Sequence, residues 1–360
     1  MRFSNTSHHI PSITWLVVAL TGMIAMVLLL RLPAELRVRL EPVNSLRPDF
    51  GSQSVVVSAD ERIFTLFAAL NAAGFDQEYE GIPMSPVRQQ IRAALAGKEI
   101  PSLARLRPYF DRITDYHLVV WVLQRGSVPD FGRAEEGWWV STRAADFDGL
   151  AVALSDFYRE AEIANLWHLV EPQHGVEIDH WQPLAETSMS NLQAYLRIAE
   201  LPFQQLVVIP NLLDSYYSGY GPQIGATAYV VAGPTETDLS VKGLIEHETL
   251  HSVIGPMLDR NIHIISPAQR NRLFAVLSKL MPSSYGTWSS ILEESLIRSI
   301  GLRMLNDELL RNRMINQLED DGFLLIRPLC QALQEYEQSN RTFEEYLPVL
   351  LETINDVHLP

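Results

Sequence analysis

The stretch GLIEHETLHSVIG, residues 243–255, decides how the rest of the chain is interpreted, because it contains the pattern H-E-x-x-H. Residues four apart lie on one face of a helix, so His247 and His251 can reach a single ion. Two neutral imidazoles and one further ligand leave a zinc ion one open position for a water, whose pKa the metal lowers to about 7. Glu248 lies about 100° around the helix from His247. It is the candidate general base that accepts the proton of that water.

The surroundings of this pattern favour a metal site over a chance occurrence. Both histidines share one helix stripe with apolar residues, Leu244, Ile254 and Leu258, and this stripe predicts a buried face. Uncoordinated pairs of histidines on such a face are uncommon. Asp238 or Ser240 can cap the start of the helix, and Gly255-Pro256 supplies a stop, which predicts a helix of about 15 residues.

A third metal ligand has to come from further along the chain. No third histidine follows at the spacing H-x-x-G-x-x-H, since Gly255-Pro256 is followed by Met257 and Leu258. A carboxylate is therefore needed. The helix predicted within YGTWSSILEESLIRSI, residues 285–300, offers Glu293 and Glu294.

At this second helix the chain resembles the gluzincin metallopeptidases, in which a glutamate on a second helix completes the site and a polar residue follows four positions later. Glu294 with Arg298 fits this spacing, whereas Glu293, one residue earlier, does not. The resemblance implies a zincin-like fold, Zn²⁺ as the cofactor and a peptide or protein as the substrate. The implied ligands are His247, His251 and Glu294.

More closely, the chain is similar to a bacterial group of gluzincin-like proteins that is classed as a domain of unknown function. The resemblance covers about Ser54 to Glu352. Ser299 stands where alanine is expected, which leaves the ligands unchanged. The similar elements are VVVSADERIFTLFAALNAAGF, the EHETLH helix, Y-G-x-W ahead of E-x-x-x-R, and GFLLIRPLCQALQEY. The resemblance supplies a fold and a metal, but no substrate specificity.

Charge and cysteine content exclude several classes of function. The chain of 360 residues has a formal net charge of -15 at pH 7 and no run of Lys or Arg, which argues against nucleic acid as a partner. Cys330 is the single cysteine, so neither an intrachain disulfide nor a cysteine-based zinc cluster can form.

Residues 10–30 contain no charged side chain. As a helix this run spans about 31 Å, which matches the hydrocarbon core of a bilayer. It is longer than the apolar part of a cleaved signal peptide and is not followed by a typical cleavage site, so we expect a single-pass membrane anchor. A short tail, residues 1–9, precedes it, and a tether, residues 31–53, follows. We expect the large domain to lie outside the cytoplasm, because a lone amino-terminal anchor most often acts as an uncleaved export signal. The three arginines after the run weakly favour the opposite orientation, with the large domain in the cytoplasm.

The remaining chain predicts an α+β, mostly helical fold: a zincin-like catalytic core with a small sheet and an active-site helix. Residues 54–360 form this domain, with a helical half, residues 54–200, and a catalytic half, residues 201–360. Strands are expected at residues 54–58, 205–210 and 226–232. Between the last two, residues 215–221 form either a surface turn or a mobile wall over a site. Helices are expected at 58–73, 85–97, 101–113, 116–124, 146–169, 183–198, 267–281, 286–305, 307–319, 323–338 and 342–355.

We therefore predict a membrane-anchored zinc-dependent peptidase with Glu248 as general base. Tyr285 and His263 are candidates for stabilising the oxyanion, because each falls between the two metal-binding helices. By similarity, the edge of the strand at residues 224–232 would hold the substrate. One alternative is a catalytically inactive zincin-like interaction module at the membrane, and another is hydrolysis of a non-peptide amide or ester. The oligomeric state stays open.

Overall fold

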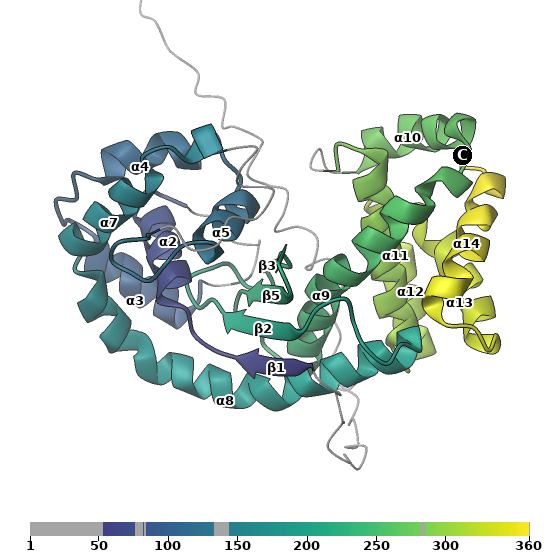
Figure 1. Cartoon of the computed structure of the whole chain (residues 1–360), viewed down its shortest axis with the longest axis horizontal. Coiled ribbons are helices and arrows are strands. Elements are labelled where there is room, and N and C mark those ends of the chain that lie inside the picture. The colour runs from purple at the N-terminus through teal and green to yellow at the C-terminus, as the bar shows by residue number, and fades with distance from the viewer. Residues whose placement is uncertain (1–52, 76–81, 83, 133–143, 282–284, 360) are drawn as a thin grey trace, which may run out of the picture.

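The computed structural model describes residues 53–359 apart from 76–81, 83, 133–143 and 282–284. It shows a mostly helical α+β fold with a small mixed sheet, as the sequence predicts (Figure 1). The helices are α2 (Glu61–Ala72), α3 (Pro86–Leu95), α4 (Leu103–Phe110), α5 (Asp115–Leu123), α7 (Leu150–Glu160), α8 (Ile163–Leu196), α9 (Asp238–Asn261), α10 (Pro267–Leu280), α11 (Trp288–Met304), α12 (Glu308–Asp320), α13 (Ile326–Gln338) and α14 (Phe343–Thr353), with the 3₁₀ turns η3 (Ala144–Phe147), η4 (Ile262–Ile264) and η5 (Ile354–Asp356).

The sheet has the order β1-β2-β5-β3, with β4 also paired to β5. The three predicted strands are confirmed as β1 (Ser54–Val57), β2 (Gln205–Pro210) and β5 (Thr227–Ala232), which run parallel. Two short strands, β3 (Gly219–Tyr220) and β4 (Gln223–Ile224), pair antiparallel with β5. Strand β5 thus has neighbours on both sides. The expectation that this strand offers a free edge to a substrate is wrong, and β3 is the outer strand instead.

Successive residues of the sheet face two different hydrophobic cores, as the period of two in a strand requires. Leu206 and Val230 belong to the first core, which the C-terminal helices and the end of α8 complete. Ile209 and Val231 belong to the second core, which is built mainly by the helices α2 to α7. The sheet therefore lies between the two groups of helices and is shared by both halves of the chain (Figure 1).

Helix α8 is a single helix of 34 residues, where the sequence predicted two helices separated at residues 170–182. Pro172 and Pro183 lie inside it, and each interior proline costs about 3 kcal/mol. Burial outweighs this cost because ten of its side chains are buried, and each large apolar one contributes about 1.5–3 kcal/mol. Its first turns pack in the second core and its last turns in the first. The helix therefore runs along both halves of the molecule (Figure 1).

Helix α9 also continues past the predicted stop at Gly255-Pro256 and ends at Asn261. Met257 and Leu258 are buried in the first core, so tertiary packing again outweighs the local penalty of a proline. At the other end Thr237 caps the helix by accepting a hydrogen bond from the backbone N–H of Ser240. The expected caps, Asp238 and Ser240, are helical residues instead.

The segment at residues 215–221 is not a surface turn, because nearly all of it is buried; it lies against Glu248, as the alternative of a wall over the site predicts, and nothing tests whether it is mobile. Tyr220 donates a hydrogen bond to the carboxylate of Asp115 on α5, with 3.0 Å between the oxygens. Ser218 donates a hydrogen bond to Asp214, the residue just before the segment. Buried polar groups therefore tie strand β3 to the N-terminal helices.

Among the described residues no helix is both long and apolar enough to cross a membrane. The predicted anchor at residues 10–30 lies outside the part of the chain that the structure describes.

The buried carboxyl of Asp115 makes a testable contribution to the pH dependence of stability. Burial, assisted by the charge of Asp214, raises the pKa of Asp115 to about 6, whereas an unfolded aspartate has a pKa of about 3.9. Between these values the folded chain binds more protons, so the contribution of Asp115 to the free energy of unfolding falls as pH rises and stays low above pH 6. We expect Asp115→Asn to gain about 1–3 kcal/mol relative to the parent between pH 4 and pH 7. Urea unfolding of both proteins across this range measures the difference, and a constant difference would contradict the raised pKa.

Candidate metal centre

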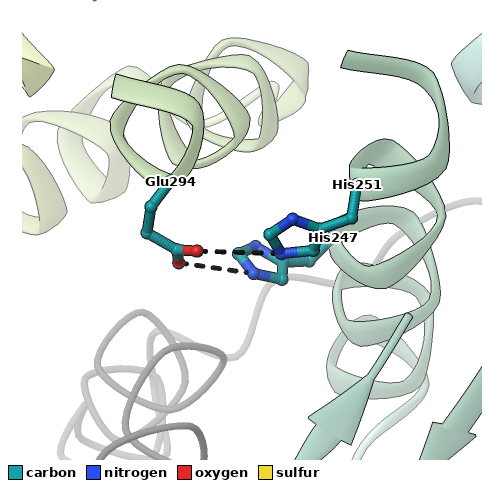
Figure 2. A group of neighbouring side chains, drawn as sticks. All are labelled: His247, His251 and Glu294. Carbon is teal, nitrogen blue, oxygen red and sulfur yellow. Dashed lines mark ion pairs between the residues drawn. The ribbon is translucent and has the colours of Figure 1, made fainter. Parts of the chain in front are cut away.

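Two neighbouring helices bring together the three predicted metal ligands. His247 and His251 project from α9, and Glu294 projects towards them from α11 (Figure 2). One ligand atom from each residue lies within 4.8 Å of the other two. Nε2 of His247 is 3.4 Å from one oxygen of Glu294, and Nε2 of His251 is 3.7 Å from the other.

The two histidines differ in environment. Burial lowers the pKa of His247 to about 3, so its ring is neutral at pH 7, which is the form that binds metal. Burial would also lower the pKa of His251, but the hydrogen bond to Glu293 and the charges of Glu294 and Glu248 raise it to about 9. A metal ion at Nε2 of His251 would displace a proton from that ring.

Glu293 contacts His251 from the side opposite the candidate metal position. Its carboxylate oxygen is 2.9 Å from Nδ1 of His251, whereas Nε2 faces Glu294. A protonated Nδ1 that donates to a carboxylate fixes the ring and leaves Nε2 free to bind an ion. The two adjacent glutamates thus have different positions: Glu294 faces both histidines, and Glu293 orients one of them.

Arg298 fixes the carboxylate of Glu294 in place. The two residues are one helical turn apart on α11, and a guanidinium nitrogen lies 2.8 Å from an oxygen of Glu294. Burial alone would raise the pKa of Glu294, but Arg298 and the two histidines outweigh it and hold the pKa below its usual range. The guanidinium itself stacks over the ring of Phe323, 4.8 Å from its centroid. The Glu294 carboxylate is therefore charged and held in one orientation.

The carboxylate of Glu248 lies under strand β3. Glu248 is 4% exposed, and burial raises its pKa to about 7. A Cβ atom at Gly219 would lie 2.4 Å from its carboxylate, and one at Gly221 would lie 2.2 Å from its backbone carbonyl oxygen. Real Cβ atoms do not approach that closely. Gly221 is therefore required for close packing on the backbone of α9, whereas a side chain at position 219 would displace the side chains of Glu248 and Leu244.

The donor set and its geometry fit a metal ion. Nε2 of His247 is buried and has no hydrogen-bond partner among the described residues, which leaves its lone pair available. Two ligands about 2.1 Å from a tetrahedral ion are about 3.4 Å apart, and the observed separation of His247 and Glu294 equals this value. The group formed by His247, His251 and Glu294 could therefore hold a metal ion.

Tyr285 and His263, the two candidates for stabilising the oxyanion, lie in different places. Tyr285 is 7% exposed and packs edge-on against Phe323, and the charges of Glu294, Arg298 and Glu248 act on its phenol. His263 is exposed in η4, beyond the end of α9. It follows His251 by twelve residues, about 18 Å along a helix. The structure thus places Tyr285 beside the metal ligands and His263 away from them.

Sequence reasoning missed Tyr116, a residue of α5 that precedes the metal-binding helix by more than a hundred positions. Burial, followed by the charges of Glu248 on α9 and Glu293 on α11, raises its pKa to about 12. No pattern in the sequence links it to the histidines. The short distance between Glu293 and His251 was also not predicted.

Comparison with known proteins gives one partial match. A family described as a domain of unknown function (DUF4932) matches residues 230–353, a stretch that contains α9 to α14 and hence all three candidate ligands. The match starts at the end of β5, well after Ser54, where the sequence resemblance begins. Searches of curated proteins and of solved structures gave no match. The match agrees with the expected domain of unknown function, and the gluzincin assignment stays a prediction.

The different positions of the two glutamates predict different losses of metal. Glu294→Ala removes a direct ligand and should leave the purified chain without stoichiometric zinc. Glu293→Ala removes only the partner of His251 and should weaken zinc binding by about 10–100-fold. Competition with a chelator measures both affinities. Equal losses, or a larger loss for Glu293→Ala, would contradict the ligand assignment.

The close packing of β3 on α9 predicts a large effect at Gly221. Because a Cβ there meets the backbone of Glu248 and not a flexible side-chain end, Gly221→Ala should destabilise the fold by about 1–3 kcal/mol. Gly243→Ala is the matched control, since nothing lies within 4 Å of its Cβ position and alanine favours a helix by about 0.5–1 kcal/mol. Urea unfolding distinguishes the two variants, and an equal effect would show that β3 is not packed as described.

Proposed function

We propose that this chain is a zinc-dependent peptidase that hydrolyses peptide bonds with Glu248 as general base. One observation carries the proposal: the buried carboxylate of Glu248 comes directly after one member of a His-His-Glu group that could hold a metal ion, and the charges of His251 and Glu294 act on it. A metal that only stabilises the fold needs no such neighbour, because structural zinc sites are closed by four protein ligands. The three described ligands leave one position open.

Each residue of the site has a role in this reaction. Zinc held by His247, His251 and Glu294 would act as a Lewis acid and lower the pKa of an attacking water. The carboxylate of Glu248 accepts the proton of that water and passes it to the leaving amine. Burial raises the pKa of Glu248 to about 7. This suits the role, because a general base is most effective when its pKa lies near the working pH.

The outer strand of the sheet is the best candidate for binding the substrate. Strand β3 comes last in the strand order and lies against Glu248. Because β3 is buried, an extended peptide could add to this edge only if the neighbouring side chains moved aside, and it would then form main-chain hydrogen bonds next to the candidate general base, whatever its sequence. This supports a peptide or protein as the substrate.

The sequence also supports a proposal for where the chain is located. We propose that residues 10–30, which carry no charge, anchor the chain in a membrane as a single span. The catalytic domain would then lie outside the cytoplasm and act on proteins there.

Glu248→Gln tests the proposed reaction most directly. Glutamine keeps the size and the hydrogen bonding of the side chain but cannot accept the proton. We expect the full chain carrying this substitution to fold and to bind zinc, while hydrolysis of casein, used as an unstructured protein, falls by about 10²-fold or more. Activity of the parent should also disappear with a chelator and return when zinc is added.

Two results would contradict the proposed function. The first is a parent, loaded with zinc, that cleaves no protein. The second is a Glu248→Gln variant that is as active as the parent. Either result would favour the interaction module, in which the metal group has no catalytic task.

A further inference from the structure

Strand β3 reaches the candidate site as the segment Gly219-Tyr220-Gly221, in which Tyr220 has the only side chain. The strand pairs with β5 at just two positions, where Gly219 lies opposite Ala232 and Tyr220 opposite Val231. Glycine on both sides gives the backbone much conformational freedom, so this short pairing does little to hold the segment. The position of β3 therefore depends strongly on the contacts that the side chain of Tyr220 makes.

Both the ring and the hydroxyl of Tyr220 are held by helices of the N-terminal half. The side chain is 1% exposed, and its ring packs against that of Phe67 on α2, with 6.0 Å between the centroids. The hydroxyl donates a hydrogen bond to the carboxylate of Asp115 on α5, with 3.0 Å between the oxygens. Because a hydrogen bond is directional, this contact favours one orientation of Tyr220.

The backbone of the same strand forms a wall against Glu248. The carboxylate of Glu248 accepts no hydrogen bond from another described residue, so packing has to fix its direction. A Cβ at Gly219 would lie 2.4 Å from Oε1 of Glu248, and one at Gly221 would lie 2.2 Å from the carbonyl oxygen of the same residue. A shift of β3 away from α9 would therefore leave room for the carboxylate to change its rotamer.

We infer that Tyr220 is a positioning residue for the general base. Its hydrogen bond to Asp115 holds β3 against α9 and thereby keeps the carboxylate of Glu248 directed at the attacking water. The inference rests on the proposed peptidase function, and it gives the N-terminal helices a part in the reaction. No bond to the substrate forms at the hydroxyl of Tyr220, so this residue affects hydrolysis only through Glu248.

The test uses two matched comparisons in the full chain. Tyr220→Phe removes the hydroxyl and keeps the ring. Its control is Tyr158→Phe, because Tyr158 on α7 also donates a phenol hydroxyl to a carboxylate, that of Glu61 on α2 at 2.7 Å, but this bond joins two helices of the N-terminal half. The second comparison is at Asp115. Asp115→Asn keeps an oxygen that can accept the hydrogen bond, whereas Asp115→Leu keeps the size of the side chain and removes the acceptor.

Hydrogen exchange of backbone amides tests the attachment of β3 without any substrate. Tyr220→Phe and Asp115→Leu should raise the exchange rates of residues 219–221 by about ten-fold or more, because a buried hydrogen bond to a carboxylate no longer opposes local opening. Asp115→Asn should raise these rates far less, and Tyr158→Phe should leave them unchanged. Parent-like rates in Tyr220→Phe would show that the hydroxyl does not hold the strand, and would overturn the inference.

Kinetics of the zinc-loaded protein tests whether the strand acts through Glu248. The substrate is a peptide that spans one casein site cleaved by the parent. We expect kcat to fall by about ten-fold or more in Tyr220→Phe and Asp115→Leu, since a small misplacement of a catalytic group can cost about 10²-fold, and far less in Asp115→Asn. Bound zinc should stay at the parent value. When Glu248 is already glutamine there is no base to position, so adding Tyr220→Phe to Glu248→Gln should lower the remaining hydrolysis by about two-fold at most.

The possible failures are distinguishable. A zinc-loaded parent that cleaves no protein overturns the peptidase function and this inference with it. An active parent with an equally active Tyr220→Phe variant overturns only the role of Tyr220. An equal loss when Tyr220→Phe is added to the parent and to Glu248→Gln shows that the tyrosine supports the fold or substrate binding and not the base, which also overturns the inference. Equal losses of kcat in Asp115→Asn and Asp115→Leu would do the same, since only the first keeps the acceptor.

Discussion

The ion pair between Arg298 and Glu294 is the interaction on which the candidate site depends. Both side chains are at most 5% exposed, and their charged atoms are 2.8 Å apart. A buried carboxylate without a partner would take up a proton and could no longer bind a cation. Arg298 prevents this, and its own burial is compensated by Glu294 and by the ring of Phe323. The charge pair therefore keeps the carboxylate of Glu294 in the form that could bind a cation.

Regular secondary structure makes this arrangement rigid. Two ligands lie one turn apart on α9, and the third ligand and its arginine lie one turn apart on α11, so each pair is positioned by backbone hydrogen bonds. Sites built on helices hold their geometry more accurately than sites on loops. Strand β3 completes the packing. Glycine at positions 219 and 221 allows its backbone to reach the helix at Glu248, and a larger side chain would push the strand away.

The sheet and α8 explain why the N-terminal helices matter to a site formed by C-terminal ones. The two faces of the sheet belong to different cores, so neither group of helices can shift without disturbing the strands between them. Asp115 and Tyr220 then connect α5 to the outer strand. This connection uses buried polar groups, which are costly unless paired. The hydrogen bond between Tyr220 and Asp115 therefore favours a single position of the strand.

The sequence by itself predicted the candidate ligands, Glu294 through the resemblance to the gluzincins, as well as the candidate general base and most elements of the fold. His247, Glu248 and His251 could be predicted because a helix has a fixed period, and the short strands because β-branched runs lie between turn residues. Tertiary structure alone decided the rest. Pro172, Pro183 and Pro256 do not end their helices. Each proline carries a local penalty that can be read from the sequence, but burial of the other side chains of the helix outweighs it. The contact of Glu293 with His251, the packing of the two glycines and the position of Tyr116 depend on how separate elements meet in space. Periodicity within one element carries no information about such contacts.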